Sequence, residues 1–192
     1  LRARNVIIHE RGTCWNQPAR YGFITRFNAS KANIVITNSQ ATKTMLIKKF
    51  RIPKDKINVI LNGINVEQKS YKHQKKNNYF RVGFIGRLDS PKGLHVLIDA
   101  IGKLKDHKIE LIIAGNGPLD NELREQANDL NNVTFIGRIL ELPDFFKSLD
   151  LLVVPSIREP LGNVCIEAGL YRVPVLASNI DGIAEIIEHE VS

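Results

Sequence analysis

The C-terminal part of the chain alternates between short apolar runs and longer segments whose apolar residues recur at helical spacing. The first such segment carries Leu94, Leu97, Ile98 and Ile101. Apolar runs separated by helices predict an α/β fold, a Rossmann-like parallel sheet with helices on both faces. The predicted strands are Phe80–Ile85, Glu110–Ala114, Val133–Ile136, Leu151–Val154 and Val173–Ala177. Five helices are predicted: one that begins after Gly93, one at Leu119–Leu130, one at Glu141–Leu149, one that begins at Gly162–Asn163, and a last one at Ile183–Glu188.

The N-terminal part shows the same alternation over a shorter length. Strands are predicted at Asn5–His9, Ala32–Thr37 and Ile57–Leu61, with helices at Ala19–Ser30 and from Asn38 or Ser39 to Phe50. Either Asn38 or Ser39 can cap the second helix, and Pro53 stops it. About two strand–helix units are too few for a doubly wound domain, so this part is predicted to be the tail of a second α/β domain.

A polar segment separates the two parts. Residues Glu67–Asn78 contain almost no apolar side chain and are predicted to form a linker. The predicted organisation is therefore 1–66 as the end of an N-terminal domain, 67–78 as the linker, and 79–192 as a C-terminal domain that is incomplete at its end.

The charge of the chain favours anionic partners without choosing among them. The formal net charge is +7, much of it in two clusters, Lys43–Lys56 and Lys69–Lys76, which can equally be solvated surface. The linker has one aromatic residue, Tyr71, and no stacking platform, so nucleic acid is not an expected partner. Cys14 and Cys165 are far apart and lack metal-ligand spacing, which favours a reducing compartment and a role for Cys165 as a small apolar packing residue. No signal peptide and no apolar run long enough to span a bilayer are visible.

Candidate anion-binding residues follow the first strand of the C-terminal part. In open parallel sheets ligands bind where the strands end, and Gly86-Arg87-Leu88-Asp89-Ser90-Pro91-Lys92-Gly93 lies at such an end. Arg87 and Lys92 can both reach one anion, and such charge-assisted contacts contribute about 1.5–3 kcal/mol each. An ordinary turn with two exposed cations is the alternative. The turns at Gly115–Pro118 and Gly137–Arg138 belong to the same edge, and the first of them needs no ligand to explain it.

The stretch from Val153 to Glu167 is predicted to hold the chemistry. The loop after the strand carries Glu159, and Glu167 follows eight residues later, inside the helix that opens at Gly162–Asn163. A helix start presents unpaired N–H groups and a partial positive charge, which suits a phosphate. Two unrelated surface acids are the alternative.

Taken together and in order, these motifs resemble a known family. GRLDSPKG, IIAGNGP, FIGR, PSIREPLGNVCIEAG and PVLASNIDGIAE are similar to the motifs of the family 4 (group 1) retaining nucleotide-sugar glycosyltransferases of the two-domain GT-B fold. The resemblance covers about Asn33 to Ile187, and Glu159 and Glu167 form its most specific motif, E-x7-E. Upstream, IVITNSQATK and VILNGINV resemble segments that close the acceptor domain, and His9 resembles an acceptor-side histidine; a buried structural histidine is the alternative. The resemblance implies a chain that lacks most of the acceptor domain and the closing helices.

The resemblance also implies roles. Arg87 and Lys92 would hold the donor diphosphate and stabilise the leaving group, Glu159 would contact the donor sugar, and Glu167 would accept the ribose hydroxyls. The remaining donor-binding residues would be Gly86, Gly137, Arg138, Leu161, Gly162, Asn163 and Val164.

Further expectations follow for substrates and location. The donor would be a UDP-, GDP- or ADP-sugar and the acceptor a glycan or lipid-linked molecule in polysaccharide or cell-envelope synthesis. The resemblance implies that no metal or other cofactor is needed, which is consistent with the absence of a D-x-D pair. The location would be the cytoplasm, with peripheral contact to the inner face of the membrane left open. The fragment alone would be weakly active or inactive.

The sequence departs from the family pattern at two positions, and two functions other than glycosyl transfer are possible. Arg172 stands where the family commonly has a small residue or Gly, and Asp181 where the first of two glycines is usual; an Asp side chain there would crowd a sugar. A GT-B-fold sugar-nucleotide epimerase would share this edge of the sheet, and a non-catalytic nucleotide-binding domain would keep the fold without the reaction.

Overall fold

A computed structural model describes residues 5–12, 22–64 and 78–188, which form two compact units. The first unit comprises Leu1–Gly63, Glu159–Gly162 and Asp181–Ser192, and the second comprises Ile64–Arg158 and Asn163–Ile180. Two C-terminal segments thus belong with the N-terminal residues. The predicted linker lies outside the described residues except for Asn78, and the predicted boundaries 1–66, 67–78 and 79–192 stay a prediction.

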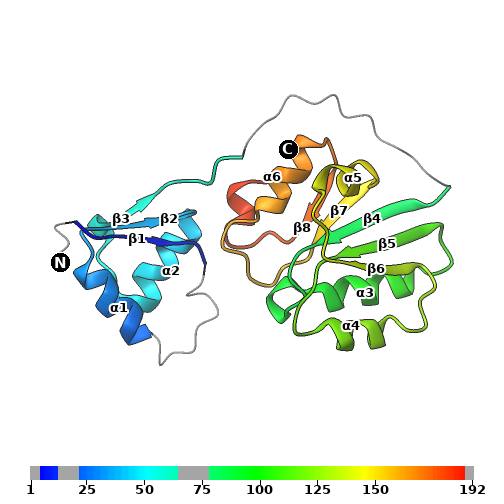
Figure 1. The fold of residues 1–192 in the computed structure, drawn as a ribbon, viewed down its shortest axis with the longest axis horizontal. Helices are drawn as coiled ribbons and strands as arrows, with labels where there is room; N and C mark the ends of the chain where they lie inside the picture. The colour runs from blue at the N-terminus through cyan, green and yellow to red at the C-terminus, as the bar shows by residue number, and fades with distance from the viewer. Residues whose placement is uncertain (1–4, 13–21, 65–77, 189–192) are drawn as a thin grey trace. The chain divides into compact units, whose positions relative to one another are not determined.

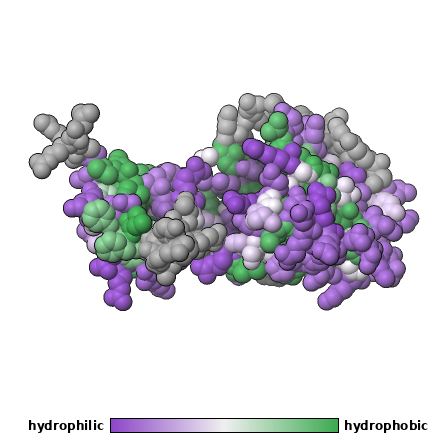
Figure 2. All heavy atoms as spheres, turned by 60° about the horizontal axis from the view of Figure 1, so that its bottom comes forward, coloured by the Kyte–Doolittle hydropathy of each residue, from purple (hydrophilic) through white to green (hydrophobic). Residues whose placement is uncertain are grey.

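The first unit is a three-stranded parallel sheet with two helices. Its elements are β1 (Ile7–Glu10), α1 (Gly22–Lys31), β2 (Ile34–Thr37), α2 (Gln40–Phe50), a 3-10 turn (Lys54–Lys56) and β3 (Ile57–Val59), with strand order β1-β2-β3. The core is formed by side chains such as Leu46 and Phe50 of α2, packed on Val35 and Ile57 of the sheet. Three apolar side chains of α1 are exposed: Phe23 (76%), Ile24 (52%) and Phe27 (52%). Figure 2 shows hydrophobic surface in green on this unit.

The second unit contains the predicted five-stranded parallel sheet. Its strands are β4 (Phe80–Ile85), β5 (Ile109–Ala114), β6 (Val133–Gly137), β7 (Leu151–Val154) and β8 (Val175–Ala177), in the order β6-β5-β4-β7-β8. Its helices are α3 (Leu94–Lys103), α4 (Asp120–Gln126), α5 (Leu142–Lys147) and α6 (Asn163–Leu170). The order reverses beside β4, because successive units are added first on one side of it and then on the other (Figure 1).

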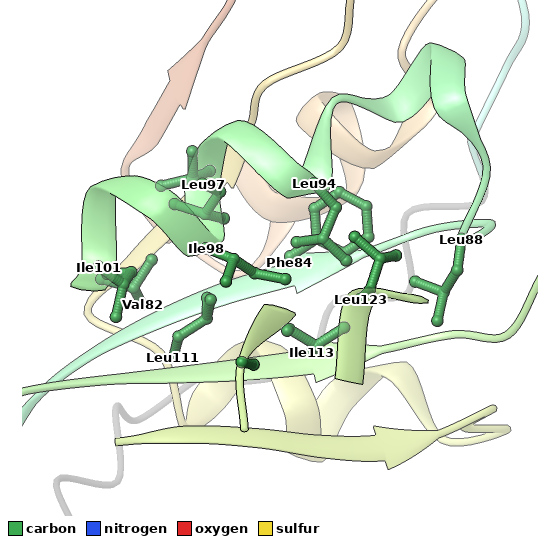
Figure 3. Packing of buried hydrophobic residues seen from close by; sticks show 12 residues of the cluster. Val82, Phe84, Leu88, Leu94, Leu97, Ile98, Ile101, Leu111, Ile113 and Leu123 are labelled. Carbon is green, nitrogen blue, oxygen red and sulfur yellow. The ribbon is translucent and has the colours of Figure 1, made fainter. Parts of the chain in front are cut away.

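The two faces of the sheet are covered by different helices. In Figure 1, α3 and α4 lie on one side of the sheet and α5 and α6 on the other. Side chains of β4 alternate accordingly: Val82 and Phe84 pack with Leu94 and Leu97 of α3 (Figure 3), whereas an added Cβ at Gly83 would overlap the side chain of Leu149. The prediction of a Rossmann-like sheet with helices on both faces is confirmed.

One predicted helix is wrong in type. The segment predicted as a helix at Ile183–Glu188 forms a 3-10 turn at Ile183–Glu185. The N–H groups of Glu185 and Ile186 donate to the carbonyls three residues earlier, at 3.2 and 2.9 Å, which tightens the turn. The Glu185 side chain is meanwhile held by the start of α2, through its backbone N–H groups.

The end of α6 explains why a small residue is expected at position 172. The Val173 N–H donates to the Ala168 carbonyl and the Arg172 N–H to the Gly169 carbonyl, both at 3.0 Å, which is the Schellman pattern of a helix end. This pattern places Arg172 in the left-handed region, with φ = 57°. Glycine adopts that conformation without steric cost, whereas a residue with a Cβ does not.

We expect Arg172→Gly to stabilise the protein. Glycine removes the strain of the left-handed conformation, but it also increases the entropy of the unfolded chain. The net gain in the free energy of unfolding is about 0.5–1 kcal/mol. The melting temperature should rise by about 1–4 °C in a thermal unfolding scan. Arg26→Gly, inside α1, is the matched control and should lower the melting temperature, because glycine destabilises a helix interior. A fall with both variants would contradict the strain argument.

Candidate functional site

The carboxyl ends of the strands in the second unit meet in a set of loops joined by backbone hydrogen bonds. The Gly86 N–H donates to the Ala114 carbonyl (3.0 Å), the Leu88 N–H to Asn116 (2.9 Å), and the Gly115 N–H to Gly137 (2.7 Å). These bonds link the loops after β4, β5 and β6. The predicted residues Gly86 and Gly137 therefore lie on one continuous edge, as their places at strand ends indicate.

The loop after β4 also contacts the loop after β7. The Pro91 carbonyl accepts from the N–H groups of Ile157 (2.8 Å) and Arg158 (3.2 Å). An added Cβ at Gly93 would overlap the Pro155 carbonyl oxygen, so only glycine permits this approach. The chain passes directly from Arg158 to Glu159, so the β4 loop is anchored one residue before the predicted sugar-binding acid.

Arg87 and Lys92 lie on the same loop but differ in environment. The Arg87 side chain is 70% exposed and pairs with Asp89, at 3.4 Å between Nε and Oδ2. Lys92 is half-buried, and its side chain passes close to Gly86. The other carboxylate oxygen of Asp89, Oδ1, is buried without a hydrogen-bond partner in the described part of the chain. An exposed ion pair at this distance contributes little to stability, so Arg87 can leave Asp89 for a better anion at low cost.

The other predicted donor-binding residues differ in burial and belong to both units. Arg138 is exposed and follows Gly137, whose φ is 69°. Asn163 and Val164 form the first turn of α6 in the second unit, and Leu161 and Gly162 are buried in the first unit. Cys165 of α6 is a free, buried thiol, as expected of a small packing residue.

Glu167 lies on α6 and is half-buried. Loss of solvation on burial raises the pKa of its carboxyl above the usual value of 4.5, because the interior disfavours the charged form. The folded chain therefore holds this proton at a pH where the unfolded chain has lost it. Glu167 therefore favours the folded state most at a pH below the pKa that its carboxyl has in the unfolded chain. This contribution is lost as the pH rises from that pKa to the higher pKa in the folded chain.

We expect Glu167→Gln to stabilise the fold at neutral pH and, if Glu167 accepts from the ribose hydroxyls as the resemblance implies, to weaken donor binding. The amide removes the buried charge, so the melting temperature should exceed that of the wild type near pH 7, and the difference should shrink toward about pH 4. Thermal scans across this range, with the exposed Glu122→Gln as control, test the first effect. Titration with nucleotide sugar tests the second. A pH-independent difference in melting temperature would argue against the buried charge as its cause.

Glu159 lies in the first unit and is only 7% exposed. Its N–H donates to Oδ2 of Asp181 (3.2 Å), and its carbonyl accepts from the Gly182 N–H (3.0 Å). The carboxylate of Asp181, expected to crowd a sugar, thus binds the backbone beside Glu159. Asp181 has φ = 42°, which Asp tolerates better than most residues and which explains the glycine usual in the family. Sequence reasoning missed this structural role of Asp181.

His9 is exposed at the end of β1, so the alternative of a buried structural histidine is wrong. Its predicted acceptor-side role stays a prediction. Over the described ranges, no three His, Cys, Asp or Glu side chains gather in a way that could hold a metal ion. None of the helices described is long and apolar enough to cross a bilayer.

Comparison with known proteins gives two family matches. Residues 65–192 match the model described as glycosyl transferases group 1, and residues 6–68 match the model described as glycosyltransferase family 4.

Two curated proteins illustrate the sequence relationship. The uncharacterized glycosyltransferase MJ1607 of Methanocaldococcus jannaschii is 36% identical, with 82% of this chain and 45% of that protein covered. The capsular polysaccharide biosynthesis glycosyltransferase CapM of Staphylococcus aureus is 27% identical, with 90% of this chain and 44% of that protein covered. The chain thus spans about half the length of these relatives.

Solved structures resemble the chain over nearly its whole length. HepE of Anabaena in complex with UDP-glucose has a TM-score of 0.85 and 29% identity, with 97% of this chain and 56% of that chain covered. TarM of S. aureus, in a complex that contains UDP, has a TM-score of 0.74 and 25% identity, with 88% of this chain and 34% of that chain covered.

Proposed function

Since the chain belongs to the group 1 glycosyl transferases, we propose that it supplies the donor-binding part of an enzyme that moves a sugar from a nucleotide-diphosphate sugar to an acceptor. The observation that carries the proposal is the joined edge of loops in the second unit. Arg87 and Lys92 share the β4 loop there, and Pro91 of that loop holds the segment leading into Glu159.

The chemistry proposed for these residues follows from their charge. Arg87 and Lys92 bind the diphosphate and stabilise the negative charge that builds on it as the sugar leaves. The N–H groups of Asn163 and Val164 at the start of α6 add partial positive charge. Glu167 accepts from the ribose hydroxyls, Arg138 and Gly137 contact the base, and Glu159 contacts the sugar with Leu161 and Gly162.

A UDP-sugar is the first donor to test. HepE, which is 28–29% identical to this chain, binds UDP and UDP-glucose in its crystal structures. GDP- and ADP-sugars remain alternatives.

The finer proposals concern stereochemistry, acceptor and location. We place the enzyme in the retaining family 4 on the E-x7-E motif of Glu159 and Glu167, and propose catalysis without a metal. A glycan or lipid-linked acceptor in polysaccharide or cell-envelope synthesis is supported by the name of CapM. The proposed location is the cytoplasm, with peripheral contact to the inner membrane face.

Calorimetric titration with UDP-glucose, GDP-mannose and ADP-glucose tests the proposal. One of them should bind, and Arg87→Ala should weaken that binding about 10- to 100-fold, as expected for loss of one charge-assisted contact. Lys103→Ala, at the other end of α3, removes the same charge away from the edge and should leave affinity unchanged. No binding of any donor, or equal loss with both variants, would count against the site. Product analysis, free epimer against glycoside, separates transfer from epimerisation.

A further inference from the structure

The loop Glu159–Gly162, here called the Glu159 loop, is held by residues distant in sequence. The Pro160 carbonyl accepts from Oγ of Ser39 (2.6 Å), and the Glu159 carbonyl accepts from the Gly182 N–H (3.0 Å). A Cβ added at Gly12 would overlap the Pro160 ring, so the residues that follow β1 also lie against this loop. All of these residues belong to the first unit.

Ser39 has two functions that use different parts of its hydroxyl group. As the N-cap of α2, its oxygen accepts from the Thr42 N–H (3.0 Å). The same oxygen lies 2.9 Å from Oγ1 of Thr42. Because a carbonyl oxygen can only accept, the single hydroxyl proton of Ser39 is the one donated to Pro160, and the Thr42 hydroxyl is then the donor to Ser39. Ser39 is fully buried, and water cannot replace this donor.

The same helix start is tied to the segment that follows Asp181. The carboxylate of Glu185 accepts from the N–H groups of Gln40 (2.8 Å) and Ala41 (2.6 Å). A negative charge is favourable at a helix N-terminus, and these N–H groups have no partner within the helix. Hydrogen bonds thus close a ring from α2 through Pro160, Glu159 and Gly182 to Glu185 and back to α2.

We propose that Ser39 is a positioning residue, which orients the carboxylate of Glu159 by holding the carbonyl of the next residue. The inference rests on the proposed function, since it takes Glu159 as the acid that contacts the donor sugar. A small displacement of the Glu159 carboxylate should lower the rate of transfer more than the affinity for the donor. The reaction requires a narrower range of positions for this group than binding does. Ser39 therefore acts on turnover through Glu159, without touching the donor.

Three variants separate positioning from simple helix capping. Ser39→Ala removes the proton donor and the cap together, and Ser39→Thr restores both. Lys48→Gly destabilises α2 by about the same amount at an exposed position that does not contact the Glu159 loop.

The full chain is then examined by amide hydrogen exchange and by turnover of UDP-glucose. Ser39→Ala should raise exchange at the Glu159 and Gly182 amides about tenfold, the size expected for one lost hydrogen bond. It should lower kcat about tenfold with KM changed less than about twofold. Ser39→Thr should match the wild type in both measurements, and Lys48→Gly should lower the melting temperature without either change.

Failure of this inference and failure of the proposed function are distinguishable. Unchanged exchange in Ser39→Ala, or the same changes in Lys48→Gly, overturns the positioning role of Ser39. If the wild type neither binds nor turns over any of the three nucleotide sugars, the proposed function is overturned. The assignment of Glu159 then fails with it, whereas the exchange data still decide whether Ser39 holds the loop.

Discussion

Gly115→Ala is expected to destabilise the protein by roughly 3–5 kcal/mol, which is at the upper end for a single substitution. Gly115 follows β5 with φ = 135°, a conformation that residues with a Cβ rarely adopt. An added Cβ would also overlap the carbonyl oxygen of Gly86 on the neighbouring loop. That oxygen belongs to the backbone and cannot rotate away, and Gly86 is itself bound to the Ala114 carbonyl (3.0 Å). Strain and clash therefore add.

Two other glycines separate these contributions. Gly137 has φ = 69° with open space where a Cβ would lie, so Gly137→Ala should cost only the left-handed strain, roughly 1–2 kcal/mol. Gly169 lies inside α6, also with open space, so Gly169→Ala should stabilise by about 1 kcal/mol. Urea unfolding at constant m-value gives the three free energies of unfolding. If Gly115→Ala costs no more than Gly137→Ala, the β4 and β5 loops do not approach as closely as described.

The strands of the second unit were the most predictable part of the molecule. The bounds of β4 and β7 agree with the apolar runs Phe80–Ile85 and Leu151–Val154, because each run ends at a glycine or proline that stops the ladder. All five strands are parallel, in the order β6-β5-β4-β7-β8. The loops that the sequence assigns to strand ends therefore share one edge.

Contacts between distant segments could not be predicted. Ser39 was recognised as a candidate cap from its position before a helical pattern, but its bond to Pro160 spans 121 residues. The bonds from Gln40 and Ala41 to Glu185 span 145 and 144 residues. No local pattern specifies such pairs, since they depend on how segments fold back within the first unit. The bond from the Glu159 N–H to Asp181, which spans 22 residues, explains why a carboxylate at position 181 is compatible with the loop.

Arg172 and Asp181 both depart from the family pattern, and the structure gives a physical reason for each. Both stand where glycine or a small residue is usual, and both have positive φ, at 57° and 42°. Asp181 offsets its strain by accepting from the Glu159 N–H. Among the described residues, by contrast, exposed Arg172 has no bond that the Schellman pattern would not also give glycine. The two substitutions therefore differ: only Arg172 is expected to be replaced by glycine with a gain in stability.

Glu159→Gln is expected to lower the rate of sugar transfer about 10²- to 10³-fold, as loss of one electrostatic contact to the reacting centre does in other enzymes. The substitution keeps the size of the side chain and removes only its charge. The bonds to Ser39, Gly182 and Asp181 use backbone groups of Glu159 and Pro160, which the substitution keeps. Donor affinity, measured by titration, should change much less than the rate, because the diphosphate is bound by Arg87 and Lys92 in the proposed site.

The control for this variant is Glu125→Gln on the exposed side of α4, which removes the same charge away from the proposed site. Its transfer rate, measured as nucleotide released in the presence of acceptor, should equal that of the wild type. Full-rate transfer by Glu159→Gln with intact donor binding would remove Glu159 from the reaction and favour a nucleotide-binding role for the fold. A loss of donor affinity with an unchanged rate at saturating donor would instead place Glu159 in ground-state binding, since uniform binding affects KM rather than kcat.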